Sequence, residues 1–181
     1  MLKKTANSNH IEEKIVWARC CFIQLREIFL EDKTVSRLTT ELLSAIESSR
    51  TKMRLAGIMD LCRQCEEEEG GSCCGAGMEE RYDPHILVIN LLLGCTLPEK
   101  REYPDSCFFL GKKGCTLKAR HVICVNYLCK KIENSVNPNM ISKLRQAEGK
   151  ELNILFVLHE YIKRLLPQYN KKNYHLIQNP K

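Results

Sequence analysis

The sequence predicts a mainly α protein in which an N-terminal helical hairpin and a C-terminal helix surround a loop-rich, cysteine-rich centre. Apolar residues recur at steps of three and four at both ends of the chain, which is the period of an amphipathic helix. Glycines and prolines concentrate between Cys62 and Cys129, where we expect loops to dominate. All of the 11 cysteines except Cys20 and Cys21 lie in that same stretch, a density that indicates metal binding.

The first part of the chain predicts two helices packed as a hairpin. One helix face collects Ile11, Ile15, Ala18, Phe22, Leu25 and Phe29, which alternate at steps of four and three. The charged stretch 31–33 interrupts this pattern, and Thr34 can cap a second helix. We expect the second helix to run through Gly57 and to deliver Cys62 at its end, because no proline interrupts it.

Shorter helices are expected further along the chain. Asp83 followed by Pro84 is typical of a helix start, and Gly94 of its end. Residues 119–132 predict another short helix. A last amphipathic helix begins near Asn137 and continues to Pro167, beyond which the tail 168–181 is polar and expected to fray.

The composition is that of a compact globular unit, with 44% hydrophobic and 28% charged residues. We divide it into an N-terminal helical hairpin (1–61), a cysteine-rich metal-binding centre (62–133), and a C-terminal helix with its polar tail (134–181). The longest apolar run, residues 86–93, is too short to span a membrane. The first ten residues contain no apolar segment of the secretory kind. We therefore expect no membrane span and a cytoplasmic location.

The net charge of +6 comes from lysines and arginines that are interleaved with acids along the chain. Nucleic-acid binding would require a concentrated basic stripe, so we do not expect nucleic acid as a partner.

The cysteines fall into two groups along the chain. In a cytoplasmic protein, disulfides are not the usual explanation for so many cysteines, and soft thiolate ligands select zinc or iron. The first group is the Cys62-x2-Cys65 pair and the adjacent Cys73 and Cys74; the second comprises Cys107, Cys115, Cys124 and Cys129. Eight sulfurs suffice for two sites of four ligands each.

The adjacent pair Cys73 and Cys74 is informative, because neighbouring side chains diverge in a helix or a strand. Either the two sulfurs serve different metals, or irregular backbone wraps a larger multinuclear cluster. The glycines at 75 and 77 suit irregular backbone.

These cysteines also carry a family resemblance. The segments 62–65 (CRQC), 73–75 (CCG), 107–110 (CFFL) and 115–117 (CTL), with Arg120 before Cys124, resemble the YkgJ-type cysteine-cluster family. That family is described as zinc- or iron-chelating and is related to the flagellin lysine N-methylase FliB. The resemblance implies that the eight cysteines are metal ligands, and it is the only basis for a methyl-transfer reaction or an S-adenosylmethionine cofactor. The chain departs from the family pattern in the longer spacing before the adjacent pair and in having His121 where the family has proline.

Other residues receive a structural interpretation or a secondary role. Cys95 and His121 are additional candidate metal ligands. We interpret Cys20 and Cys21 as buried thiols inside a helix, and His85 and His159 as structural. Trp17 is expected in the core of the hairpin.

Two functions follow from this reading. The first is an iron–sulfur protein, with a [4Fe–4S] cluster, that acts in redox, sensing or methyl-transfer chemistry. The second is a non-catalytic module stapled by zinc, whose helical hairpin binds a protein partner. The sequence carries none of the familiar nucleotide-loop, nucleophile-elbow or metalloprotease motifs, so it assigns no catalytic residue.

Overall fold

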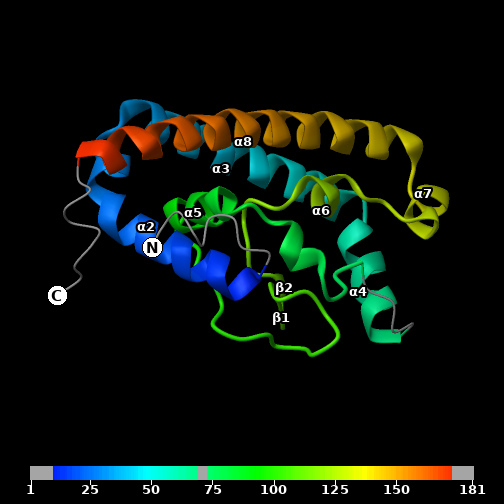
Figure 1. The fold of residues 1–181 in the computed structure, drawn as a ribbon. Coiled ribbons are helices and arrows are strands. Elements are labelled where there is room, and N and C mark those ends of the chain that lie inside the picture. Colours follow the sequence, from blue (N-terminus) through cyan, green and yellow to red (C-terminus); the bar gives the residue numbers. More distant parts are fainter. Residues whose placement is uncertain (1–9, 69–72, 173–181) are drawn as a thin grey trace.

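The computed structural model describes residues 10–68 and 73–172, and its fold is mainly α as the sequence predicts (Figure 1). Three long helices form its frame: α2 (Ile11–Glu31), α3 (Lys33–Leu55) and α8 (Pro138–Lys172). Helix α8 lies along α3 for much of its length, and this is the most extensive contact between two helices. None of the described helices combines the length and the apolar character needed to cross a membrane.

The turn between α2 and α3 is built on Asp32. Its Oδ1 accepts hydrogen bonds from the backbone N–H groups of Thr34 and Val35, at 2.8 and 2.9 Å, which makes it the N-cap of α3. Thr34, the predicted cap, lies inside the first turn instead. The other carboxylate oxygen of Asp32 accepts a hydrogen bond of 2.9 Å from the Tyr161 hydroxyl on α8. One side chain therefore joins all three long helices.

The second helix does not run through Gly57 as predicted. It ends at Leu55, and Gly57 adopts a positive φ of 70° before a separate helix, α4 (Ile58–Glu68), begins. A left-handed residue turns the chain, and glycine takes this conformation without the steric cost that a Cβ would impose. Cys62 and Cys65 consequently lie within α4, one turn apart.

After α4 and the adjacent cysteines, the centre continues with a short 3-10 helix, η1 (Met78–Arg81), and helix α5 (Pro84–Leu92). Asp83 caps α5 and proline occupies its first turn, as predicted. Helix α5 contacts both α2 and α8. It is apolar around its circumference because it lies in the core, where Leu87, Val88 and Ile89 are fully buried.

The remaining elements of the centre are small. Strands β1 (Leu110–Gly111) and β2 (Gly114–Cys115) form an antiparallel hairpin in which Leu110 pairs with Cys115. The helix predicted over 119–132 is wrong as a single element. The structure has α6 (Val122–Asn126) and α7 (Lys130–Ser135), separated by Tyr127 and Cys129 in extended backbone conformations.

Helix α8 continues through Pro167 to Lys172, so the prediction that it ends at Pro167 is also wrong. Leu165 and Leu166 remain buried on the core in its last turns, and this burial offsets the backbone hydrogen bond that proline removes. The predicted frayed tail beyond residue 172 lies outside the described residues.

Two apolar clusters hold the fold together. The larger one joins α2, α3, α5 and α8 and includes Trp17, which confirms its predicted place in the core. A smaller cluster joins the start of α4 to α7 and the start of α8, through Ile58, Leu128, Ile132 and Leu144. The smaller cluster matters for the cysteines because Cys129 packs against it.

Candidate metal centre

The first group of neighbouring thiols comes from α4 and α7. Cys62 and Cys65 lie one turn apart on α4, and Cys129 is the residue just before α7. Burial raises the pKa of Cys62, and the negative charges of Cys73, Cys129 and Cys65 add to the rise. These four cysteines are therefore electrostatic neighbours, and we name them the α4 set.

A second group surrounds the β-hairpin. Burial raises the pKa of Cys107 to about 12, with contributions from the negative charges of Glu79, Cys115 and Cys74. Burial also raises the pKa of Cys115, and the Cys124 thiolate adds to that rise. Cys74, Cys107, Cys115 and Cys124 form this second chain of neighbours, which we name the hairpin set.

These charge effects cross the order of the sequence. The charge of Cys73 acts on Cys62 of α4, whereas the charge of Cys74 acts on Cys107. The backbone is irregular there, because residues 73 and 74 form a bend. Immediately afterwards, Gly75 pairs with Ser106 in an isolated bridge, and the carbonyl oxygen of Cys74 accepts a hydrogen bond from the Cys107 N–H. That pairing places the backbone of Cys74 beside that of Cys107.

Tyr82 fixes the far side of the hairpin set. Its buried hydroxyl accepts a hydrogen bond of 3.1 Å from the backbone N–H of His121 and lies 3.9 Å from the sulfur of Cys124. The Tyr82 ring packs edge-on against Phe109, with 5.1 Å between ring centroids. Burial raises the pKa of Tyr82, so the hydroxyl keeps its proton and can donate it to the sulfur.

Asn90 ties α5 to the segment that follows Cys115. Its amide nitrogen donates to the Ala119 carbonyl at 2.9 Å. Its amide oxygen accepts from the backbone N–H groups of Lys118 and Ala119, at 2.9 and 3.0 Å. This fully buried amide satisfies three backbone groups of the loop at once, which holds the loop between Cys115 and Cys124 on the core.

Glu79 joins backbone segments near Cys107 in a similar way. Its carboxylate accepts hydrogen bonds from the backbone N–H groups of Gly77 and Phe108 and from the guanidinium of Arg101. Arg101 in turn donates to the Ser106 carbonyl. Burial opposes ionisation of Glu79, but these donors prevail and lower its pKa, so the segments carrying Cys74 and Cys107 are joined by a charged network.

Two arginines supply positive charge to the cysteines. Arg120 lowers the pKa of both Cys62 and Cys115, and Arg50 lowers that of Cys115. Arg50 reaches from α3 to donate to the Leu117 carbonyl at 3.0 Å. Burial and the nearby Arg120 lower the pKa of Arg50, as expected for cations held close together. The arginines therefore favour thiolates in both sets.

Cys20, Cys21 and Cys95 belong to neither set. Cys21 is buried as predicted, but Cys20 is exposed, so the prediction of burial is wrong for that residue. The reason is geometric, since neighbouring residues on α2 point about 100° apart. Cys95 donates from its sulfur to the Asn90 amide oxygen at 3.5 Å.

His121 caps α6. Its Nδ1 accepts a hydrogen bond of 3.2 Å from the Ile123 N–H. A neutral imidazole that accepts at Nδ1 carries its proton on Nε2. Binding a metal through either nitrogen of His121 would therefore require the loss of this cap.

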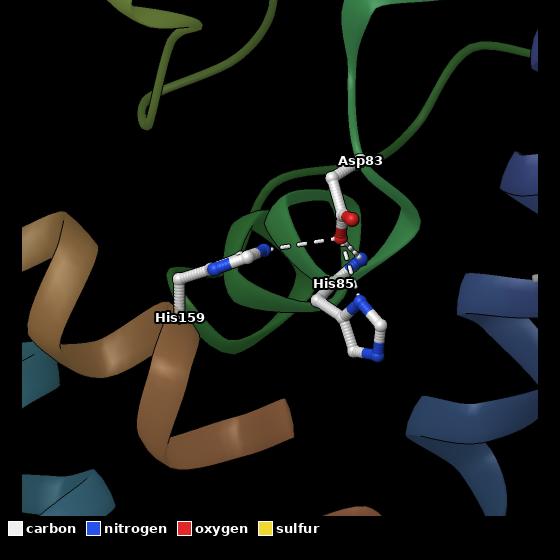
Figure 2. Close-up of side chains that lie close together, drawn as sticks. All are labelled: Asp83, His85 and His159. Atoms are coloured by element: carbon white, nitrogen blue, oxygen red, sulfur yellow. Dashed lines mark hydrogen bonds and ion pairs between the residues drawn. The ribbon is translucent and has the colours of Figure 1, made fainter. Parts of the chain in front are cut away.

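A different group of ligand-type side chains lies away from the cysteines. Asp83, His85 and His159 form the only trio of His, Cys, Asp or Glu side chains, among residues 10–68 and 73–172, whose ligand atoms all lie within 4.8 Å of one another (Figure 2). From the sequence, both histidines were expected to be structural. The DPH segment at a helix start could have signalled the first two residues, but His159 lies 76 positions away from Asp83 and no local pattern connects them.

Tyr82, Asn90, Glu79 and Arg50 were also not predicted as parts of the centre, and Arg120 was singled out only through the family resemblance. Their roles depend on contacts between segments far apart in the chain, such as Arg50 with Leu117. Comparisons of the chain with models of protein families, with curated proteins and with solved structures gave no match.

Proposed function

We propose that the chain is a metal-binding protein whose α4 set and hairpin set each hold a metal centre, with iron–sulfur clusters as the favoured occupants. The observation that supports this most directly is that cysteines from distant segments lie close enough to raise one another's pKa values. Four thiolates complete the ligand set of a [4Fe–4S] cluster or of a structural zinc ion. The donor chemistry of both sets therefore fits such a group.

The spacing of the sulfurs favours a cluster over single zinc ions. A tetrahedral zinc ion with bonds of about 2.3 Å places its four sulfurs roughly 3.8 Å apart. Among the described residues, no three cysteine sulfurs lie within 4.8 Å of one another. An iron–sulfur cluster takes each thiolate on a different iron atom and so accepts wider spacing.

The surrounding charges suit a thiolate-rich centre. Burial and then the neighbouring thiolates raise the pKa values of Cys62 and Cys115, and Arg120 at both residues and Arg50 at Cys115 partly oppose this rise. A bound cluster would supply one-electron redox chemistry, which fits a redox or sensing role. A methyl-transfer role and S-adenosylmethionine binding rest only on the resemblance to the YkgJ-type family.

The alternative is a zinc-stapled module that binds a protein partner without catalysis. It is favoured by the outer face of α2, where Val16, Ile23 and Leu30 are 57%, 74% and 61% exposed. These residues follow one another at steps of seven, so they form a stripe along one side of the helix. An exposed apolar stripe of this kind suits contact with a second helix.

The occupant can be identified on protein purified without oxygen, by measuring iron, zinc and acid-labile sulfide together with the visible spectrum. Two [4Fe–4S] clusters would give about eight iron and eight sulfide per chain and a brown colour. Zinc without sulfide would refute the iron–sulfur assignment and support the zinc-stapled alternative. Protein free of both metals would refute metal binding by the cysteines.

Serine variants test the two sets. Cys62→Ser and Cys124→Ser should each lose about half of the metal, because each removes one of four ligands from one site. Cys20→Ser, an exposed cysteine on α2, is the matched control and should keep full metal content. Loss of metal in the control, or full retention in Cys62→Ser, would contradict the ligand assignment.

Double variants separate the grouping in space from the grouping along the sequence. Cys62→Ser with Cys129→Ser should lose no more metal than either single variant, because both belong to the α4 set. Cys62→Ser with Cys74→Ser should lose the metal of both sites. The opposite pattern would support the order of the sequence, in which Cys62 and Cys74 share one site.

A further inference from the structure

Asp83, His85 and His159 come together where the start of α5 meets α8 (Figure 2). Asp83 is the N-cap of α5, His85 lies in its first turn, and His159 comes from the middle of α8. Trp17 of α2 closes one side, with its ring 5.1 Å from the His85 ring in an edge-on contact. Three helices therefore fix the positions of these side chains.

Both imidazole rings direct a nitrogen at the same oxygen atom. His85 Nδ1 lies 2.6 Å from Asp83 Oδ1, and His159 Nε2 lies 3.1 Å from it. The two rings are nearly perpendicular, with centroids 5.7 Å apart. Zinc and similar ions hold nitrogen and oxygen ligands at about 2.0 Å, which places the ligand atoms of one ion roughly 3.3 Å apart. An ion could replace the shared protons if His85 Nδ1 and Asp83 Oδ1, now 2.6 Å apart, separated by about 0.7 Å.

A second observation points to a ligand at this place. The other ring nitrogen of His159, Nδ1, lies 3.2 Å from Glu160 Oε1. Without a metal, His159 can satisfy both carboxylates only by carrying two protons. With a metal on Nε2, a neutral His159 satisfies both, because Nδ1–H then donates to Glu160. Carboxylates oriented in this way commonly fix the tautomer of metal-binding histidines.

We propose that Asp83, His85 and His159 form a metal site, distinct from the two cysteine sets, that binds a divalent transition-metal ion such as Zn²⁺ through two imidazole nitrogens and one carboxylate oxygen. Three protein ligands leave at least one coordination position for water, as in catalytic rather than structural zinc sites. The Asp83 side chain is 40% exposed, so water can reach the carboxylate of this trio. The histidines are each only 16% exposed and are held by packing.

The site is independent of the function proposed for the cysteines, and a direct measurement can separate them. Zn²⁺ is titrated into the intact chain with its cysteine centre as isolated, while the imidazole nitrogens are observed by long-range proton–nitrogen NMR. We expect one further Zn²⁺ per chain, with shifts at His85 Nδ1 and His159 Nε2. Binding that leaves both resonances unchanged, or no further binding, would overturn the proposal whatever the cysteines hold.

Two variants and a control sharpen the test. Asp83→Asn keeps a good helix N-cap while removing the charge, and His159→Gln keeps a side-chain donor toward Asp83. Each should weaken the affinity for the additional Zn²⁺ by roughly tenfold or more, without changing the metal held by the cysteines. His10→Gln replaces an exposed histidine and should bind as the wild type does. Equal affinity in all three variants would overturn the proposal, and circular dichroism checks that each is folded.

Discussion

Glu151 is a buried acid whose pKa depends on its contacts. It lies on α8, is only 1% exposed, and packs against Ser49 of α3. Ser49 also approaches the carbonyl oxygen of Ile46 at 3.0 Å. A hydroxyl has one proton to donate, so the Ile46 carbonyl and the Glu151 carboxylate share the proton of Ser49. Burial raises the pKa of Glu151, and its hydrogen bond with Ser49 and the charges of Arg120 and Arg50 only partly oppose this.

The raised pKa makes a prediction about stability and pH. The folded protein holds this proton more tightly than the unfolded chain, in which the pKa is near 4.5. The stabilisation is therefore complete below pH 4.5 and is lost as the pH rises through the folded-state pKa. Glu151→Gln removes this dependence. The free energy of unfolding of the variant should therefore increase relative to that of the wild type as the pH rises above 4.5.

Urea denaturation at a series of pH values measures this difference. Glu27→Gln, an exposed residue on α2, is the control and should show no such trend. A difference between Glu151→Gln and the wild type that stays constant across the series would contradict a raised pKa for Glu151.

At the scale of elements, the break between α3 and α4 determines where the first cysteines lie. Gly57 has a φ of 70°, and a Cβ placed there would meet no atom within 4 Å. Gly57→Ala should therefore cost about 1 kcal/mol through backbone strain alone. Gly149 is also uncrowded but lies inside α8, so Gly149→Ala should stabilise the protein by about 0.5–1 kcal/mol.

These two glycines give a matched pair with opposite expected signs. Both free energies of unfolding can be measured by urea denaturation on the same preparation. Stabilisation by Gly57→Ala would mean that α3 and α4 can join into one continuous helix, as the sequence alone suggested.

The elements also show what could be predicted and what could not. The period of apolar residues predicted α2 and α8, and the Asp83–Pro84 pair predicted the start of α5. The break at Gly57 was missed because one glycine costs a helix only about 1 kcal/mol, so it does not by itself decide between bending and continuing. Pro167 was overweighted for the converse reason, since the buried Leu165 and Leu166 retain α8 beyond it.

The candidate site, like the helices, could be predicted only in part from the sequence. The cysteine types and spacings indicate metal ligands, and that prediction stands as a proposal. Which cysteines share a set depends on contacts such as Cys107 with Cys74 and on the packing of Cys129 against the smaller apolar cluster. Such contacts between distant segments leave no periodic trace in the sequence. The trio of Asp83, His85 and His159 was missed for this reason.

At the scale of the whole molecule, the two apolar clusters predict an uneven response to metal removal. The larger cluster joins α2, α3, α5 and α8 and can remain folded on apolar burial alone. Helices α4 and α7 pack on the smaller cluster instead, so they gain most from a metal. Chelation should therefore expose α4 and α7 while α3 and α8 stay protected.

Hydrogen exchange followed by mass spectrometry measures this response segment by segment, with and without chelator. Peptides from α3 and α8 act as internal controls within the same sample. An equal loss of protection in all segments would show that the metal supports the entire fold, and no change anywhere would argue against metal binding by the cysteines.

The long packing of α3 on α8 also orders events during synthesis. Tyr161 of α8 bonds to Asp32 across 129 positions of the chain, and the entire cysteine-rich centre lies between these partners. The apolar face of α3 leaves the ribosome early but can be covered only after about a hundred further residues have followed. Closing so long a loop is slow compared with forming a local helix. The cysteines thus emerge before the last helix closes over the molecule.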